Sequence, residues 1–468
     1  MKWESFAYRA GICYSGAAGH IFLCPADFTD KEIIMTLELQ QLSDFIINGT
    51  SPYHAAAHAE KVLLEAGFIK LPFREDWKLE KGGRYYTFPF PTTLYAFSVG
   101  EHADFETHEG EKVHIAGAHL DFPALKIKPH PELFRHGYMQ LNTEVYGGAN
   151  LHTWFDRPLS LAGTVTLEHK DGIESRLLDF DRPILYIPNL AIHMNREVNE
   201  KGAQINRQQH MLPLLGMTSE DGSGLSSDSK FADLIAAELG CNAEEICDYD
   251  LNIYNPAEPV SVGINEDFIS SPRLDDLTSV SALVHGLIDS CDKSRVNLVC
   301  LFDNEEVGSL SKQGAHSTLP FILLQKIWQA FGKDELRCMS DLTSGLLISA
   351  DVAHAYHPNY PAPQDITNFP VLGGGVILKT AANQSYAWDP RGLSEIIYLC
   401  HANNIPFQRF VKESNTKGGS TIGSIISSRL PMRTIDLGAG LLAMHSLMEV
   451  MGAKDQTALQ QLMTAFFS

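Results

Sequence analysis

The segment 296–309 constrains the fold of this chain most strongly, because an apolar run ends there in adjacent carboxylates. Residues 296–302 (VNLVCLF) predict a buried strand, and residues 303–306 (Asp-Asn-Glu-Glu) follow it at once. Carboxylates at the end of a buried strand are costly unless a cation or a polar partner compensates them. In open α/β sheets, ligands bind at the carboxyl ends of strands, where Glu305 and Glu306 could divide metal binding and proton transfer. An ordinary acidic turn fits the segment equally well.

The composition is that of a globular protein with an acidic surface. The chain has 468 residues, of which 44% are hydrophobic and 20% are charged. This length favours two domains. The formal net charge of −21 argues against nucleic acid and anionic membranes as partners. No apolar run reaches the ~18 residues that span a bilayer. The eight cysteines include no Cys-x-x-Cys pair, which favours a reducing, cytoplasmic location and argues against a zinc ribbon.

The sequence pattern changes twice along the chain. Residues 35–128 and 260–468 alternate helical and strand patterns, whereas residues 129–259 contain short strands separated by turns. We therefore expect an α/β domain interrupted by an inserted β-rich domain. The polar tract 219–230 predicts a mobile surface loop. Residues 1–34 form an N-terminal extension whose status the sequence leaves open, and we interpret Met35 as the start of translation.

Hydrophobic periodicity predicts the individual elements. Helices are expected at 37–46, 54–66, 277–288, 319–331 and 441–450. Strands are expected at 85–90, 94–99, 112–119, 160–168, 176–179, 296–302, 346–350 and 434–437. The sequence contains no internal repeat.

Imidazoles and carboxylates recur beside the ends of the predicted elements. They are His119, Asp121, Asp275, Asp276, Glu305, Glu306, Asp351 and His445. These groups are the ligands that zinc and similar divalent ions take in hydrolytic sites. Two metals ~3.5–4 Å apart need a bridging carboxylate and about two further ligands each, and this set leaves one carboxylate over as a base. Each piece alone has a simpler explanation: a helix start favours Asp275-Asp276, and a lone histidine such as His445 in a helix is usually packed or solvated.

Jointly, these segments resemble the aspartyl aminopeptidase family, the M18 dizinc metallopeptidases. The resemblance runs from about residue 37 to the C-terminus in consistent order. It rests on Gly117-Ala-His-Leu-Asp121, Ser271-Pro-Arg-Leu-Asp-Asp-Leu277, Asp303-Asn-Glu-Glu-Val-Gly-Ser309, Asp351-Val-Ala-His-Ala-Tyr-His-Pro-Asn359 and Gly418-Gly-Ser-Thr-Ile-Gly423 through Met444-His-Ser446. It implies a phosphorylase/hydrolase-like α/β catalytic domain with a mixed sheet flanked by helices, interrupted by a β-rich dimerisation domain. It also implies assembly into a homododecamer.

The resemblance implies a set of metal ligands. His119 and Asp351 would bind one zinc ion, Glu306 and His445 would bind the other, and Asp275 would bridge them. The implied cofactor is two Zn²⁺ per subunit, with Mn²⁺ or Co²⁺ as alternatives.

It also implies a reaction. The N-terminal residue, preferentially Asp or Glu, would be removed from peptides with a free N-terminus by attack of a metal-bridged water. Glu305 would be the general base, and Asp121 would orient His119.

Three further residues acquire substrate-binding roles from the resemblance. Lys379 would contribute to a basic pocket for acidic side chains, His193 would reach a neighbouring subunit's active site, and Tyr386 would donate a hydrogen bond to the substrate. A surface lysine, a strand-end histidine and a core tyrosine are the simpler interpretations. Two positions depart from the family pattern. Asp276 stands where the family usually has Asn, and Ser385 stands where a basic residue often precedes the tyrosine.

Other functions use parts of the same pattern. A dizinc amidohydrolase of N-acyl amino acids would need a similar set of ligands. A non-catalytic oligomeric scaffold is disfavoured by Glu305, because a purely structural site needs no unligated base. Nucleotide binding at Thr421 is disfavoured because the sequence contains no Gly-Lys-Ser/Thr loop. His354 and His357 are expected to shape the pocket wall beside Asp351.

Overall fold

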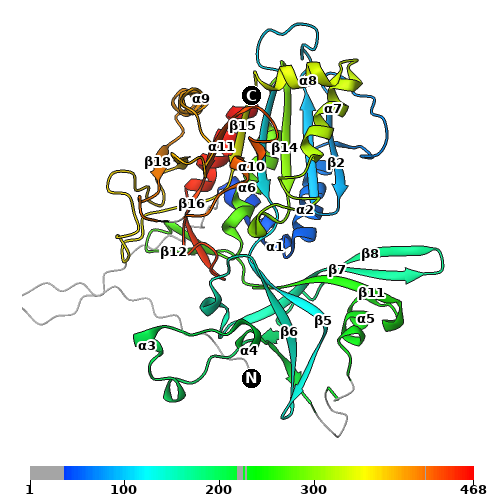
Figure 1. Ribbon diagram of the computed structural model, residues 1–468, viewed down its shortest axis with the longest axis vertical. Coiled ribbons are helices and arrows are strands. Elements are labelled where there is room, and N and C mark those ends of the chain that lie inside the picture. The colour runs from blue at the N-terminus through cyan, green and yellow to red at the C-terminus, as the bar shows by residue number, and fades with distance from the viewer. Residues whose placement is uncertain (1–35, 219–224, 227–228, 417) are drawn as a thin grey trace, which may run out of the picture. The chain divides into compact units, whose positions relative to one another are not determined.

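The structure is a computed structural model that describes residues 36–218, 225–226, 229–416 and 418–468 (Figure 1). The predicted extension 1–34 lies outside the described residues, as does most of the polar tract 219–230. The chain divides into two units, Met1–Leu37 and Glu38–Ser468, and every described strand lies in the second. Among the described residues, no helix is long and apolar enough to cross a membrane.

A nine-stranded mixed sheet contains the strands predicted in the α/β part. Its order is β1-β2-β3-β14-β4-β15-β19-β17-β18. Four parallel strands lie side by side at its centre: β14 (Val296–Phe302), β4 (Val113–His119), β15 (Leu346–Ala350) and β19 (Arg433–Gly438). The outer strands are β1 (Ile69–Lys70), β2 (Arg84–Phe90), β3 (Thr93–Val99), β17 (Val376–Thr380) and β18 (Phe407–Val411). The carboxyl ends of the four central strands therefore meet at one edge of the sheet.

Helices cover both faces of this sheet. Ile115 and Leu298 pack in one hydrophobic cluster with Trp328 of α7 (Leu319–Ala330). On the opposite face, the His114 ring stacks on Phe466 of α11 (Asp455–Phe467). Coverage on both faces explains why the central strands read as continuous apolar runs. The other α-helices of this part are α1 (Leu37–Asn48), α2 (Pro52–Glu65), α6 (Leu274–Asp289), α8 (Glu335–Leu342), α9 (Pro390–Ala402) and α10 (Ile422–Ile426).

A second, seven-stranded sheet forms between β4 and α6 in the sequence. Its strands are β5 (Ala124–Arg135), β6 (Tyr138–Tyr146), β7 (Pro158–His169), β8 (Gly172–Asp179), β9 (Leu185–Tyr186), β10 (Leu214–Met217) and β11 (Ile246–Tyr254). Strand β11 pairs with both β5 and β7, so the sheet closes on itself around its own hydrophobic cluster. The short helices α3 (Val198–Lys201), α4 (Arg207–His210) and α5 (Phe231–Leu239) accompany it. Figure 1 shows this sheet apart from the helix-covered one.

A third sheet contradicts one prediction. Its order is β12 (Val260–Val262), β13 (Phe268–Ser271), β21 (Glu449–Gly452), β20 (Gly440–Leu442) and β16 (Ala353–His354). The helix predicted at 441–450 is therefore wrong, because this segment forms β20, a turn and β21. Ala443 and His445 have φ values of 58° and 64°, a left-handed conformation that no α-helix contains. Pairing of β20 with β16 and β21 overrides the helix-like spacing of the apolar residues.

Candidate metal centre

Three predicted site residues lie at the carboxyl ends of neighbouring strands. His119 is the last residue of β4, and Asp351 directly follows β15. Glu305 begins η4 (Glu305–Val307), the 3₁₀ turn after β14. Because these strands are parallel and adjacent, the three side chains project from the same edge of the sheet.

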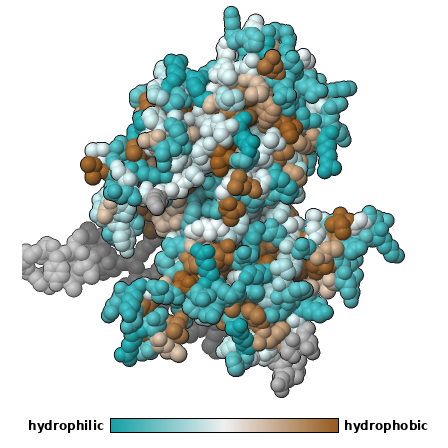
Figure 2. Space-filling model, in the orientation of Figure 1, coloured by the Kyte–Doolittle hydropathy of each residue, from teal (hydrophilic) through white to brown (hydrophobic). Residues whose placement is uncertain are grey.

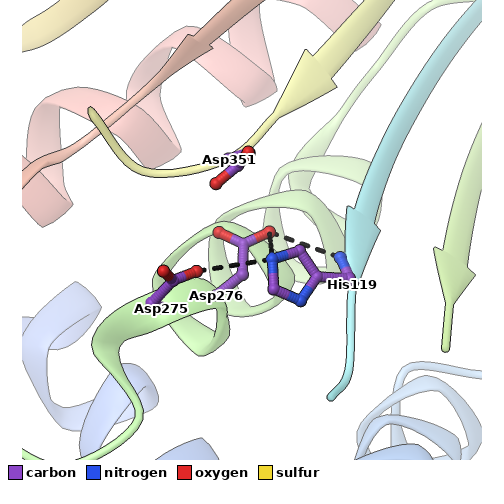
Figure 3. Close-up of side chains that lie close together, drawn as sticks. All are labelled: His119, Asp275, Asp276 and Asp351. Carbon is purple, nitrogen blue, oxygen red and sulfur yellow. Dashed lines mark hydrogen bonds and ion pairs between the residues drawn. The ribbon is translucent and has the colours of Figure 1, made fainter. Parts of the chain in front are cut away.

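The first group of possible ligands contains His119, Asp275, Asp276 and Asp351, whose ligand atoms lie within 4.8 Å of one another (Figure 3). Nε2 of His119 is 3.3 Å from Oδ1 of Asp275 and 3.9 Å from Oδ2 of Asp276. Oδ2 of Asp276 also accepts a hydrogen bond of 3.3 Å from the backbone N–H of His119. The side chains come from β4, the start of α6 and the end of β15.

The second group contains Asp275, Glu306 and His445. Nε2 of His445 is 3.2 Å from Oδ2 of Asp275 and 3.4 Å from Oε1 of Glu306. Asp275 therefore directs one carboxylate oxygen to each histidine, and so belongs to both groups. His119, Glu305 and Glu306 form a further set with ligand atoms within the same distance. All five predicted metal ligands are brought together.

The environment of these residues fits a divalent cation. The cluster contains five carboxylates and two imidazoles. Asp275 Oδ1 and Glu306 Oε1 are buried and accept no hydrogen bond from any described residue. Burial raises the pKa of Glu306 well above its usual value, and repulsion from Asp275 adds to this effect. Buried carboxylate oxygens that accept no hydrogen bond are compensated by a metal ion or a proton, and carboxylate with imidazole is a zinc ligand set.

Asp121 connects His119 to the glutamates. Nδ1 of His119 lies 2.9 Å from the backbone oxygen of Asp121 and 3.6 Å from its Oδ1, which leaves Nε2 directed at the cluster. The Asp121 carboxylate accepts hydrogen bonds of 3.1 Å from the backbone N–H groups of both Glu305 and Glu306. A partner that fixes the far nitrogen of a histidine sets the tautomer and orientation of the ring.

Glu305 differs from the other glutamate in its surroundings. Burial raises its pKa to about 8, and Asp351, Asp121 and Asp275 add to this effect against the opposing influence of His119. Its side chain also lines the cavity described below. A carboxyl group in these surroundings can take up and release a proton near neutral pH.

Glu449 is a site residue that the sequence analysis missed. Its Oε1 accepts a hydrogen bond of 2.7 Å from the backbone N–H of His445, and its Oε2 accepts one of 3.1 Å from that of Asp275. It thereby fixes the backbone of two residues in the second group. The sequence offers one indication of Glu449: it is an acidic residue in an otherwise apolar segment, which forms β21.

A cavity of about 510 Å³ opens onto both groups. Its walls include His354, Tyr386 and Thr421. The hydroxyl of Thr421 donates a hydrogen bond of 2.7 Å to Asp436. His354 faces the cavity as expected, whereas the ring of His357 packs against Tyr360. The cavity gives a ligand of amino-acid size access to the metal centre.

The three predicted substrate-binding residues have different positions. Tyr386 is a cavity wall residue. Lys379 in β17 is 1% exposed, so the simpler interpretation as a surface lysine is wrong; its Nζ donates to the backbone oxygens of Asp351 and Val352 at 2.8 and 3.2 Å. His193 lies in the exposed 3₁₀ turn η2 (Ile192–Met194), between β9 and β10 in the sequence, rather than at a strand end.

Comparison with known proteins identifies this arrangement. The model of the family described as aminopeptidase I zinc metalloprotease (M18) matches residues 45–467. A probable M18 family aminopeptidase 2 of Clostridium acetobutylicum is 40% identical over 432 residues, which cover 92% of this chain and 98% of that protein. A probable M18 family aminopeptidase 2 of Clostridium novyi is 42% identical over 418 residues, which cover 89% of this chain and 95% of that protein.

Solved structures agree with this assignment. A chain in the cryo-EM structure of the Ape4 and Nbr1 complex has a TM-score of 0.87 at 34% identity, covering 92% of this chain and 85% of that one. A chain of the S. cerevisiae mApe1 dodecamer has a TM-score of 0.77 at 27% identity, and the match covers 92% of this chain and 95% of that one. The fold is that of a zinc metallopeptidase. The chain belongs to the M18 family of zinc aminopeptidases, as the sequence motifs predicted.

Proposed function

We propose that this M18 aminopeptidase uses two zinc ions to remove N-terminal Asp or Glu from peptides that have a free α-amine. The observation that carries the two-metal proposal is Asp275, whose two oxygens face His119 and His445 separately at 3.3 and 3.2 Å. We assign His119 and Asp351 to one ion, Glu306 and His445 to the other, and Asp275 to both. Zinc, or Mn²⁺ or Co²⁺ in its place, would polarise the scissile carbonyl and lower the pKa of a bound water.

The chain's own groups then handle the proton. Glu305 takes a proton from the attacking water and passes it to the leaving amine. Its position after β14 and its pKa of about 8 in the absence of metal support this role. Asp121 holds the His119 ring and the backbone of Glu305 together, which fixes the base relative to the ligands.

Two lysines support a preference for acidic N-terminal residues. Nζ of Lys379 and Nζ of Lys412 lie 5.2 and 4.2 Å from the centre of the Tyr386 ring, which lines the cavity. Lys412 also donates a hydrogen bond of 3.1 Å to Ser385. Lys412, which directly follows β18, therefore places a positive charge beside Ser385. The family often has a basic residue at the position of Ser385. Tyr386 is proposed as a hydrogen-bond donor to the substrate.

Asp276 is proposed to act as a neutral group. Burial raises the pKa of Asp276 well above the usual value. The nearby His119 lowers this pKa, whereas repulsion from Asp351 and Asp275 raises it further. In the protonated form, Asp276 carries the same charge as the Asn that the family usually has at this position. The departure from the family pattern then leaves the charge of the metal centre unchanged.

We further propose that the subunits assemble into a homododecamer, as the similar mApe1 does. The segment around His193 supports self-association, because Leu190, Ile192 and Met194 are 56%, 48% and 74% exposed. Figure 2 shows hydrophobic residues exposed in the part of the molecule that carries α3 and α4. The inserted segment 129–259 would serve in dimerisation, and His193 would reach a neighbouring subunit's cavity. The scattered cysteines favour a cytoplasmic location.

The test combines metal analysis with one variant and a substrate panel. We expect two zinc ions per subunit, and we expect Glu305→Gln to retain both while losing turnover. Aminoacyl amides of Asp, Glu, Leu and Lys report the side-chain preference. Hydrolysis of N-acyl amino acids without cleavage of free-amine substrates would instead show an amidohydrolase, and zinc binding without any turnover would show a scaffold. Full activity of zinc-loaded Glu305→Gln would remove Glu305 from the base role.

A further inference from the structure

We propose that Tyr146, the last residue of β6, is a positioning residue for the metal centre. Its hydroxyl donates a hydrogen bond of 2.6 Å to Oδ2 of Asp121, the residue that holds His119. Through this contact the seven-stranded sheet is tied to the ligands at the carboxyl edge of the nine-stranded sheet. The inference rests on the proposed two-zinc site and extends it to a residue outside the ligand set.

The contacts of Asp121 show why this hydroxyl matters. Oδ1 of Asp121 accepts from the backbone of Glu305 and lies 3.6 Å from Nδ1 of His119, while Oδ2 accepts from the backbone of Glu306 and from Tyr146. The Asp121 side chain is completely buried. Loss of the Tyr146 hydroxyl would leave Oδ2 with one donor fewer in a site that water does not readily reach.

Tyr146 is itself held in place. Nδ2 of Asn304, the residue before Glu305, donates a hydrogen bond of 3.1 Å to the Tyr146 hydroxyl oxygen. The hydroxyl therefore joins two parts of the chain that fix the glutamates: Asp121 on one side and the start of the η4 turn on the other. Nζ of Lys126 lies 4.8 Å from the centre of the Tyr146 ring, which holds the ring from the side of β5.

The chain directly after Tyr146 also approaches the second metal group. A Cβ atom at Gly147 would lie 3.0 Å from Cβ of Glu306, and one at Gly148 would lie 3.2 Å from Nδ1 of His445. Gly147 has a φ of 73°, which glycine adopts without strain. The backbone that follows β6 therefore lies directly against the proposed ligands Glu306 and His445. The hydrogen bond from Tyr146 to Asp121 fixes the point at which this backbone segment begins.

A change in a residue that supports a metal-binding histidine commonly lowers metal affinity about 10- to 100-fold. We expect Tyr146→Phe to weaken zinc binding by about tenfold, measured by competition with a chromophoric chelator on the full chain. Tyr138→Phe is the matched control, because Tyr138 begins the same strand and is 43% exposed. It should bind zinc as the unmodified protein does. At saturating zinc, Tyr146→Phe should lower kcat more than it changes KM.

A double-mutant comparison separates positioning from a general structural role. If Tyr146 acts through Asp121, the losses of zinc affinity in Tyr146→Phe and Asp121→Asn will not add in the double variant. Asn304→Gly, which keeps the positive φ of 63° but removes the contact to Tyr146, should weaken zinc binding in the same direction. It also provides a test should Tyr146→Phe fail to fold.

The outcomes distinguish this inference from the proposed function. If the unmodified protein binds two zinc ions and cleaves its substrates, but Tyr146→Phe and Asn304→Gly bind zinc equally well, the inference is overturned and the function stands. Additive losses in the double variant would also overturn it. If the unmodified protein binds no zinc, the proposed function itself fails.

Discussion

Replacing Lys379 by Met tests whether this lysine supports the metal centre or reads the substrate. Its buried Nζ donates to the backbone oxygens of Asp351 and Val352 and lies 3.7 Å from Oδ2 of Asp351. Methionine keeps a similar length and flexibility but removes the charge and all three contacts. In the metal-free protein, the Asp351 carboxylate then loses its nearest cation.

The magnitude follows from the burial of the pair. Removing one partner of a buried ion pair costs about 3–5 kcal/mol of unfolding free energy. Burial already raises the pKa of Asp351 against the lowering influence of Lys379, so the variant raises it further. A carboxyl group whose pKa is higher in the folded state than in the unfolded state loses its contribution to stability as pH rises through that interval. The destabilisation should therefore be larger at pH 8 than at pH 5.

Urea denaturation of chelator-treated protein at both pH values measures this effect, at one protein concentration because an oligomer's stability depends on it. Lys412→Met is the matched control, since this lysine is only partly buried and should cost less than about 1 kcal/mol. A loss below about 1 kcal/mol for Lys379→Met at pH 8 would show that Lys379 does not compensate Asp351.

Three further predictions concern the metal and the substrate. Zinc affinity should rise with pH from 6 to 9, because His445, a proposed ligand, has a pKa of about 10 without metal and must release its proton to bind zinc; calorimetry in buffers of different ionisation heat measures the release. Lys412→Met should lower kcat/KM for Asp and Glu amides about tenfold, or ~1.4 kcal/mol, and leave Leu amide unchanged; equal losses on all amides would contradict a specificity role. Asp276→Asn should bind zinc within about twofold of the unmodified protein in the chelator assay, since it replaces one neutral group by another, whereas a change of about tenfold would show that Asp276 is ionised.

The sequence predicted the part of the site that lies on buried parallel strands. The apolar runs before His119, Glu305 and Asp351 are long because helices cover both faces of the sheet, so their ends could be located from hydrophobicity alone. Asp275 precedes a predicted helix, a position that a helix start alone could explain, and its role as a bridging ligand came from the family resemblance. These residues are brought together by strand order, which the family resemblance implied.

The remaining part depends on contacts that hydrophobic patterns do not encode. His445 was predicted in a helix but lies in a left-handed turn, because β20 pairs with β16, more than 80 residues earlier in the chain. Pairing of β21 with β13 places Glu449 opposite Ser271, from where its carboxylate accepts hydrogen bonds from the backbone of Asp275 and His445. Likewise, nothing in the sequence of β17 shows that Lys379 is directed inward at Asp351. Each of these positions is set by tertiary packing rather than by local propensity.

The pairing of β14 with β4 places Phe302 directly opposite His119, the last residue of its strand. Since successive side chains of a strand point to opposite sides, inserting one residue into β14 would reverse the orientation of everything beyond it. The two glutamates would then be carried away from the histidine, although the inserted residue itself touched neither. We therefore expect a change in the length of this strand to disrupt the site more than an exchange of one apolar residue for another.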